Sequence, residues 1–192
     1  MTERISAAPT TKPALLHRAV SEFIGTAFLL MAVVGSGIAG EHLSGGNVAV
    51  ALLANAVATG TALFAIILVA GPISGAHLNP VVTVAAALTS NFARRDIAPY
   101  IAAQIVGGLA GVAVAHFMFA LPLMQTSGYV RGGSGQWLAE VIATLGLLLV
   151  IWGARARPLE TVAAAVGAYI TAAYWFTAST SFANPAVTIA RT

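Results

Sequence analysis

Charged side chains are scarce in this sequence of 192 residues. Lys, Arg, Asp and Glu together account for 8% of it, whereas hydrophobic residues account for 58%. A soluble globular domain carries about 25% charged residues. The composition therefore excludes an ordinary soluble domain and predicts an integral, multi-pass membrane protein.

Cysteine is absent, which excludes disulfides and thiolate metal sites. Cysteine usage therefore does not indicate whether the protein faces an oxidising or a reducing compartment. The net charge of +3 would favour a nucleic-acid partner in a soluble protein, but here the basic residues lie between apolar runs. The sequence shows no nucleophile motif, metal-binding cluster or phosphate-binding loop. We therefore expect no enzymatic activity, no metal, no cofactor and no nucleic-acid partner.

Five apolar runs predict five membrane-spanning helices, because a helix of about 20 apolar residues crosses the hydrocarbon of a bilayer. They cover residues 19–39, 48–70, 98–121, 136–153 and 161–178. Gly71 and Pro72 are expected to break the second helix. Residues 1–16 predict a flexible tail ahead of a single membrane domain over residues 17–192.

A five-residue motif occurs twice. Residues 79–83 read Asn-Pro-Val-Val-Thr, and residues 184–188 read Asn-Pro-Ala-Val-Thr. Asn is a preferred helix N-cap and Pro is a preferred first helical residue, so each copy predicts the start of a helix. The first such helix, over residues 80–89, would be about 15 Å long, roughly half the hydrocarbon thickness. It is therefore predicted to be a re-entrant half-helix that does not cross the membrane.

The distribution of basic residues predicts which way the chain enters the membrane. With a cytoplasmic N-terminus, and with each half-helix returning to the side it left, only Arg131 falls outside. Seven basic residues fall inside: Arg4, Lys12, Arg18, Arg94, Arg95, Arg155 and Arg157. Because Lys and Arg are enriched in cytoplasmic loops, we expect a multi-pass protein of the plasma (inner) membrane with its N-terminus in the cytoplasm.

Two acids mark two halves of the chain. Glu22 begins the sequence Glu-Phe-Ile-Gly-Thr in the first span, and Glu140 begins Glu-Val-Ile-Ala-Thr in the fourth. Three spans separate them, so the two halves enter the bilayer from opposite sides, as in inverted-topology repeats. The two half-helices can then meet at their N-termini. Intramembrane acids often relay protons, but we expect these two to accept hydrogen bonds from the backbone of the half-helix loops.

These motifs together resemble the aquaporins and aquaglyceroporins, the major intrinsic protein family, over about residues 19–191. The resemblance rests on the paired Asn-Pro motifs, the paired Glu motifs and the lead-in Ser74-Gly75-x-His77-x-Asn79. It implies an all-α inverted repeat of six spans with two re-entrant half-helices. It also implies a narrow pore for water or small neutral solutes, with four identical subunits that each hold one pore.

The sequence departs from the family pattern in two places. The sixth span is absent, so we expect a fragment or a truncated product of a full-length channel. Val187 stands where the family usually has an arginine, as in bacterial relatives that are linked with arsenic handling. Arg191, four residues further on, is either a displaced filter cation or an arginine that extends outward from the helix end.

The resemblance also implies roles for individual residues. The pore constriction would be formed by Asn79, Pro80, Val81, Asn184, Pro185 and Ala186. Backbone carbonyls for the solute would come from Gly75, Ala76, His77 and Leu78, and Glu22 and Glu140 would support the loops. Family spacing, counted without gaps from the two asparagines, gives a selectivity filter of Thr59, Ala172, Ser181 and Val187.

None of these four filter residues is charged or aromatic, so we expect a wide, weakly polar filter. Such a filter favours glycerol-like polyols, urea-like molecules or neutral metalloid hydroxides such as arsenous acid over water alone. Tyr174 and its aromatic neighbours near the end of the fifth span are interpreted as packing or interface residues. Two alternatives to a passive channel remain open: a non-conducting fragment that associates with full-length subunits, and a coupled secondary transporter with broken helices.

Overall fold

The computed structural model describes residues 12–90, 92–123 and 132–191, and its regular structure there is entirely helical. Of the predicted tail over residues 1–16, the structure describes residues 12–16, and the first helix already begins at Leu15. Arg131, the basic residue expected on the outside, lies beyond the described residues. The long helices are α1 (Leu15–Leu43), α2 (Val48–Ser74), α4 (Ile97–Met118), α5 (Ser134–Ala154) and α6 (Leu159–Phe176), and the short ones are α3 (Pro80–Thr89), η1 (Arg94–Asp96) and α7 (Pro185–Ala190).

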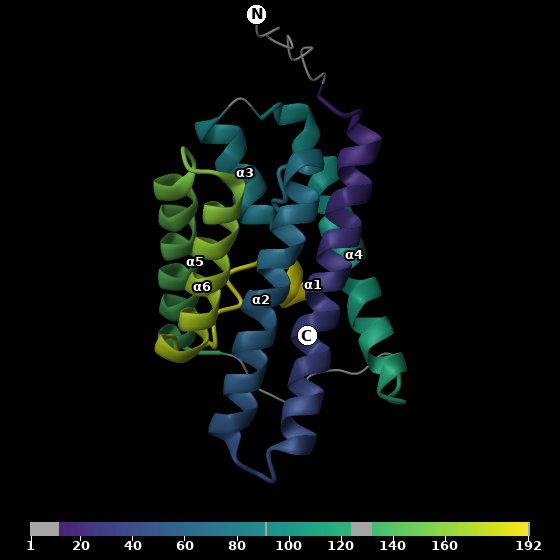
Figure 1. Cartoon of the computed structure of the whole chain (residues 1–192), viewed down its shortest axis with the longest axis vertical. Coiled ribbons are helices and arrows are strands. Elements are labelled where there is room, and N and C mark those ends of the chain that lie inside the picture. Colours follow the sequence, from purple (N-terminus) through teal and green to yellow (C-terminus); the bar gives the residue numbers. More distant parts are fainter. Residues whose placement is uncertain (1–11, 91, 124–131, 192) are drawn as a thin grey trace, which may run out of the picture.

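The long helices run side by side along the longest axis of the molecule (Figure 1). Four helical segments of the described chain are long and apolar enough to cross a membrane: α1, α2, η1 with α4, and α5. The fifth predicted span is present as the 18-residue helix α6, which packs against α2. Since α6 is not among those four, its crossing of the membrane stays a prediction.

The second helix continues further than the sequence predicted. Gly71 and Pro72 do not break α2, which extends to Ser74 and ends at Gly75. Proline removes one N–H donor, but its fixed φ angle is compatible with a helix. The helix ends where Gly75 takes a left-handed conformation with φ of 90° and donates its N–H to the Gly71 carbonyl, a common helix C-cap arrangement.

Close packing of α1 against α4 depends on two glycines of α4. A Cβ atom on Gly107 would overlap the backbone carbonyl of Phe23, and one on Gly111 would overlap that of Ala27. Small residues four apart allow the backbones of membrane helices to approach closely. The Gly107-x-x-x-Gly111 spacing therefore holds α4 directly against α1.

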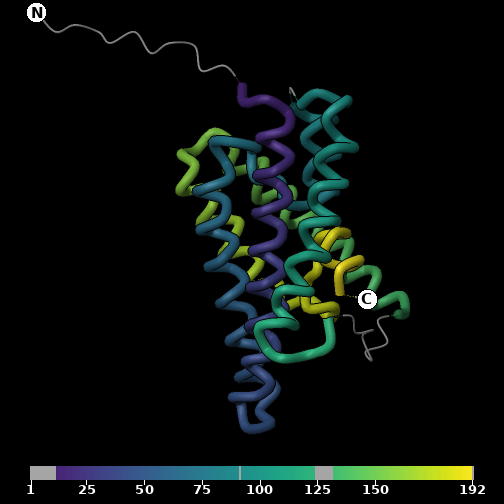
Figure 2. Tube along the Cα trace, turned by 90° about the vertical axis from the view of Figure 1, so that its right-hand side faces the viewer, coloured from purple at the N-terminus to yellow at the C-terminus, as the bar shows by residue number. Residues whose placement is uncertain are grey.

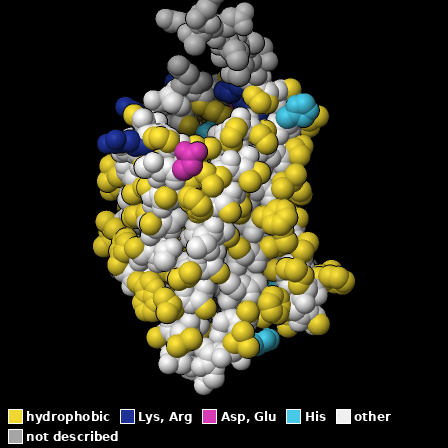
Figure 3. Space-filling view, in the orientation of Figure 1, with side chains coloured by type: hydrophobic (Ala, Val, Ile, Leu, Met, Phe, Trp, Pro, Cys, Tyr) yellow, Lys and Arg dark blue, Asp and Glu magenta, His cyan; other side chains and the backbone are white. Residues whose placement is uncertain are grey.

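One end of the molecule carries much of the described positive charge. The start of α1 and the connection between α5 and α6 both lie at the top of Figure 1. In the face that Figure 3 shows, the Lys and Arg side chains lie near this end, and hydrophobic side chains are spread over much of the length below it. Arg18 and Asp96 form a buried ion pair of 2.8 Å here. We call this end the basic end.

The short helices α3 and α7 bring their N-termini together inside the bundle. Helix α3 approaches from the basic end, and α7 lies at mid-height between the long helices, as both views show (Figures 1 and 2). Each is preceded by an irregular segment, and the two helices are in contact. The fold thus places both copies of the repeated motif at one point in the interior.

Candidate functional site

Both asparagines of the repeated motif cap a helix. The side-chain oxygen of Asn79 accepts a hydrogen bond from the Val81 N–H at 2.9 Å, and that of Asn184 accepts one from the Ala186 N–H at 3.0 Å. Pro80 and Pro185 occupy the first helical positions, where no N–H is needed. The motif therefore builds two helix starts of the same geometry.

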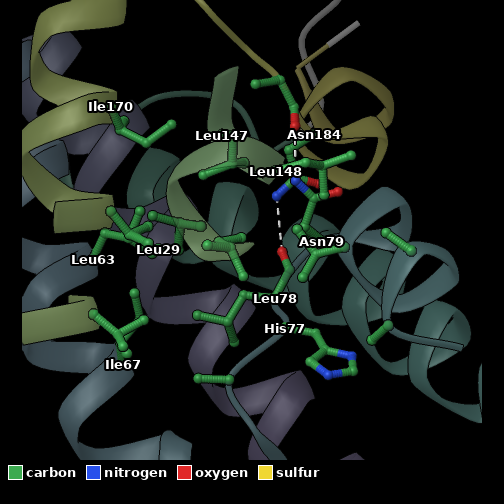
Figure 4. A pocket seen from close by; sticks show the side chains of 18 of the residues that line it. Leu29, Leu63, Ile67, His77, Leu78, Asn79, Leu147, Leu148, Ile170 and Asn184 are labelled. Atoms are coloured by element: carbon green, nitrogen blue, oxygen red, sulfur yellow. Dashed lines mark hydrogen bonds between the residues drawn. The ribbon is translucent and has the colours of Figure 1, made fainter. Parts of the chain in front are cut away.

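The two caps are also joined to each other. The amide nitrogen of Asn79 donates to the Ala183 carbonyl at 2.7 Å, and that of Asn184 donates to the Leu78 carbonyl at 2.8 Å (Figure 4). Each asparagine thus binds the carbonyl that precedes the other asparagine. A primary amide carries two N–H groups, so this exchange uses one from each side chain.

The segments that lead into the two helices have matching backbone conformations. Positive φ angles occur two residues apart in each, at Ala76 (48°) and Leu78 (52°) and at Ser181 (51°) and Ala183 (45°). A residue other than glycine pays about 1–2 kcal/mol for this left-handed conformation. With Thr180 (57°) beside Ser181, five such residues lie in the two short segments and require strong support from their surroundings.

The two glutamates of the paired Glu motifs supply that support. Glu22 accepts hydrogen bonds from the N–H groups of His77 and Leu78 at 2.9 and 2.6 Å. Glu140 accepts from Phe182 and Ala183 at 3.0 and 2.7 Å. Hydrogen bonds to a carboxylate are stronger than neutral ones. Each acid therefore holds the strained segment of its own half in place.

The first half is held by more contacts than the second. Glu22 is fully buried and also accepts hydrogen bonds from Ser74 Oγ at 2.6 Å and Gln104 Nε2 at 2.8 Å. Gln104 Nε2 lies 2.9 Å from Thr83 Oγ1 as well, which ties α4 to α3. Glu140 is half-buried, and its hydrogen bonds to the described residues are the two from the backbone.

A cavity of about 280 Å³ passes beside the joined caps. This is many times the roughly 10–15 Å³ that one water needs on the same measure. Leu63 and Ile67 of α2 and Ile170 of α6 lie on one side of it, opposite Asn79 and Asn184 (Figure 4). Its wall is mostly apolar, and both asparagines contribute polar atoms to it.

The wall contains most of the residues predicted to contact a solute. The predicted residues that line it are Thr59, Gly75, Ala76, His77, Leu78, Asn79, Ser181, Asn184 and Val187. The other constriction residues, Pro80, Val81, Pro185 and Ala186, form the first turns of α3 and α7 and lie behind the wall. Glu22 and Glu140 also lie behind it, against the loops.

The prediction for Ala172 is wrong. This residue is exposed on the outer face of α6, and it does not line the cavity. The wall residues of α6 are Leu159, Val162, Val166, Ile170 and Tyr174, which share one helical face at three- and four-residue spacing. Counting without gaps across the irregular segment 177–183 placed the filter position two residues early, on another face.

Tyr174 is one of the wall residues that were not predicted from the sequence. It is buried, and its hydroxyl lies 3.2 Å from Thr59 Oγ1 of α2. The cavity wall is therefore not free of aromatic side chains, contrary to the expectation for the filter. The four-residue spacing from Val166 through Ile170 to Tyr174 was a signal that could have placed this tyrosine on the inward face.

Two further residues near α7 matter for the polarity of the wall. The buried Ser181 hydroxyl has no hydrogen-bond partner in the described chain, and Ser181 lines the cavity. Arg191 is not a wall residue, and its guanidinium lies 4.6 Å from the centre of the Phe182 ring. Val187, where an arginine was expected from the family pattern, leaves an apolar surface at its position.

The two ends of the cavity differ. At the basic end its wall includes Ser90, Trp152 and Arg155, which are exposed. At the other end the last wall residues on α2 and α6 are Thr59 and Tyr174, and their hydroxyls are in contact. The wall of the cavity therefore reaches exposed residues at the basic end, and at the other end two of its residues are joined by a hydrogen bond.

Comparison with known proteins gives consistent matches. The family model described as "Major intrinsic protein" matches residues 9–160. The protein named "Aquaglyceroporin AqpS" from Rhizobium meliloti (strain 1021) is 50% identical over 177 residues, which cover 92% of this chain and 76% of that protein. "Aquaporin AqpM" from Methanothermobacter thermautotrophicus is 36% identical, and the match covers 72% of this chain and 65% of that protein.

A solved structure supports the fold. The X-ray structure of the aquaglyceroporin from Plasmodium falciparum superposes with a TM-score of 0.76 at 24% sequence identity, and the match covers 92% of this chain and 79% of that one. At this identity the likeness concerns the arrangement of the helices. The chain spans only part of the length of the relatives that it matches. "Aquaporin Z" from Rhodopseudomonas palustris, for example, is covered over 62% of its length.

Proposed function

Because the chain belongs to the major intrinsic protein family, whose members are membrane channels and not enzymes, we propose that its cavity is a passive pore for small neutral solutes. The observation that carries this proposal is the pair of half-helix caps at the cavity wall. Both asparagine side chains and the loop residues from Gly75 to Leu78 line this mostly apolar passage, which supports the proposal.

The caps give a passing solute hydrogen-bond partners where the two half-helices meet. Asn79 and Asn184 each have one N–H group left after their exchange across the site. The loop residues from Gly75 to Leu78 line the same wall, and we propose that their backbone carbonyls accept hydrogen bonds from the solute. A neutral solute with hydroxyl groups can exchange its water partners for these groups, while the apolar remainder of the wall binds it weakly. Selective but weak contacts are what fast permeation requires.

The charge distribution favours neutral solutes. No acidic side chain is among the described residues that line the cavity, so a cation has no counter-charge in it. The N-terminus of the ten-residue helix α3 adds a partial positive charge beside Asn79. Glu22 and Glu140 are occupied by backbone N–H groups behind the wall, which argues against the coupled transporter because neither of these two acids is free to bind an ion.

The filter composition favours polyols. Thr59, Ser181 and Val187 leave one side of the passage small and weakly polar. The relative with 50% identity is named an aquaglyceroporin, which supports glycerol-like solutes for this chain. Water, urea-like molecules and neutral metalloid hydroxides such as arsenous acid belong to the same proposal, because each is small, uncharged and able to form hydrogen bonds with hydroxyl and amide groups.

We further propose a homotetramer in the plasma membrane with the basic end in the cytoplasm. The Lys and Arg residues gathered at that end support this orientation. Large exposed apolar side chains along α1, α2 and α5 support contact with lipid or with neighbouring subunits.

Reconstitution into liposomes tests the proposed function. Stopped-flow light scattering would follow swelling of liposomes that contain the purified chain, in isotonic glycerol, urea or arsenous acid, and shrinkage in a non-permeant osmolyte. We expect glycerol and water permeabilities well above those of empty liposomes. Equal rates with and without the protein would contradict the proposal, and a response to water alone would overturn the polyol assignment.

A further inference from the structure

A buried tyrosine of α4 contacts the loop that leads into the first half-helix at two points. Tyr100 is fully buried and does not line the cavity. Its hydroxyl donates to the Ser74 carbonyl at 2.8 Å, and its ring centroid lies 5.3 Å from that of His77. Ser74 is the last residue of α2, and the wall residues Gly75 to Leu78 follow it directly. Tyr100 therefore holds the peptide group at which this part of the wall begins.

An arginine of α1 orients the tyrosine hydroxyl. Arg18 Nη1 donates to Tyr100 Oη at 3.4 Å, and Arg18 Nη2 donates to Asp96 Oδ2 at 2.8 Å. Arg18 Nε donates to the Pro13 carbonyl at 3.0 Å, so all three nitrogens of the buried guanidinium are bonded. Because a guanidinium only donates hydrogen bonds, the tyrosine oxygen accepts from Arg18 and its hydrogen is left for the Ser74 carbonyl. A chain of hydrogen bonds thus runs from Asp96 at the basic end to the loop.

The Ser74 carbonyl depends on this tyrosine because α2 ends here. In a continuing helix, a carbonyl accepts from an N–H three or four residues further on. The N–H groups at those two places belong to His77 and Leu78, and both donate to Glu22 instead. The Tyr100 hydroxyl therefore supplies the hydrogen bond that the helix no longer provides.

Ser74 transmits the position of Tyr100 to the cavity wall. Its hydroxyl donates to Glu22 at 2.6 Å and accepts from the Ala76 N–H at 3.1 Å. The peptide group that carries the Ala76 N–H also carries the Gly75 carbonyl, and Glu22 holds the next two peptide groups. A displacement of Ser74 therefore changes the direction of the carbonyls from Gly75 onward.

We propose that Tyr100 is a positioning residue of the pore: its hydrogen bond to Ser74 sets the direction of the carbonyls that face the solute, and Arg18 orients its hydroxyl for that bond. The proposal rests on the proposed channel function. Glycerol has three hydroxyl groups, and it must replace several water partners at once to enter a mostly apolar passage. Water is smaller and gives up fewer partners. A displaced loop should therefore slow glycerol more than water.

Three variants separate positioning from a general loss of stability. Tyr100→Phe removes the hydroxyl and keeps the ring. Tyr169→Phe is a matched control, because the Tyr169 hydroxyl also donates to a backbone carbonyl, that of Ala143 at 2.9 Å, and Tyr169 does not line the cavity. Both should lower Tm, because each leaves a carbonyl without its partner. Arg18→Lys keeps the charge beside Asp96, but a lysine lacks the planar fork that reaches Tyr100 and Asp96 together.

Stopped-flow light scattering of liposomes with equal amounts of each full-chain variant measures glycerol and water permeability. We expect Tyr100→Phe to lower the ratio of glycerol to water permeability about fivefold, the factor that one net hydrogen bond is worth. Arg18→Lys should lower the ratio by a smaller factor, because the tyrosine keeps its hydroxyl but loses the group that orients it. Tyr169→Phe should keep the ratio of the unmodified chain.

An unchanged ratio in Tyr100→Phe would overturn the proposal. An equal fall in Tyr169→Phe would overturn it too, since a loss of stability alone would then explain both. Should Tyr100→Phe fail to incorporate into liposomes, a lowered ratio in Arg18→Lys supports the proposal and an unchanged one overturns it. An unmodified chain that conducts neither solute would refute the proposed channel function itself, whereas a conducting chain with unaffected variants would refute only the role of Tyr100.

Discussion

Replacing Glu22 by glutamine tests how the first half-helix loop is held. Each carboxylate oxygen of Glu22 accepts two hydrogen bonds. Oε1 accepts from Ser74 Oγ and the His77 N–H, and Oε2 accepts from the Leu78 N–H and Gln104 Nε2. A glutamine keeps one oxygen and puts an NH₂ group in place of the other. The least costly orientation places the NH₂ at the Oε1 position, where the serine hydroxyl can turn to accept.

That orientation leaves the His77 N–H facing a donor. A buried unpaired N–H costs about 1–3 kcal/mol, and loss of the charge weakens the remaining bonds, since charge-assisted bonds are roughly twice as strong as neutral ones. Together these terms give a loss of about 3 kcal/mol for Glu22→Gln. The same change at Glu140 affects two N–H groups at a half-buried position that water can reach, so we expect a loss of about 1 kcal/mol.

The two variants should therefore differ clearly in thermal stability. For domains of this size, 1 kcal/mol shifts Tm by roughly 2–4 °C, so the gap between them should be about 4–8 °C. The assay is thermal unfolding of purified protein in detergent, followed by circular dichroism and by intrinsic fluorescence. Equal shifts for the two variants, or a larger one for Glu140→Gln, would mean that the four donors of Glu22 do not hold their loop more firmly than the two donors of Glu140 hold theirs.

Two further outcomes follow from the wall and from the helix packing. Val187→Arg should abolish glycerol uptake and preserve water flux, because a guanidinium would narrow the passage and add a positive charge to it. Swelling assays with glycerol and with water measure both. Unchanged uptake of both would mean that Val187 is not a filter residue. Gly111→Val should prevent stable folding, because the valine side chain would overlap the α1 backbone, whereas Gly153→Ala, at an open position, should leave the stability unchanged. Size-exclusion profiles in detergent compare the two variants. A well-folded Gly111→Val protein would contradict the close packing of α1 and α4.

The local start signals allowed an accurate prediction of the helices around the repeated motif. The bounds of α3, residues 80–89, agree with the sequence prediction, because an asparagine cap and a proline define its start without help from tertiary contacts. The end of α2 was predicted too early, because the effect of Pro72 depends on its place in the last turn of a helix that Gly75 ends. Local sequence signals were therefore sufficient to predict where these helices start, but not where α2 ends.

The arrangement across the site required the structure. No sequence pattern shows that the Asn79 amide donates to the Ala183 carbonyl, or that Asn184 donates to Leu78, because these bonds depend on how two distant loops meet. The filter prediction failed at Ala172 for a related reason. It assumed that position along α6 could be counted backward through an irregular segment, and Tyr174 takes the inward place instead.

We propose that a solute crosses this protein passively, through the cavity beside the two joined asparagines. Glycerol swelling of liposomes that contain the chain should be measured with and without an imposed pH gradient. Passive crossing gives a rate proportional to the glycerol gradient, above that of empty liposomes and unchanged by the pH gradient. A rate equal to that of empty liposomes, or uptake that requires the pH gradient, would contradict it.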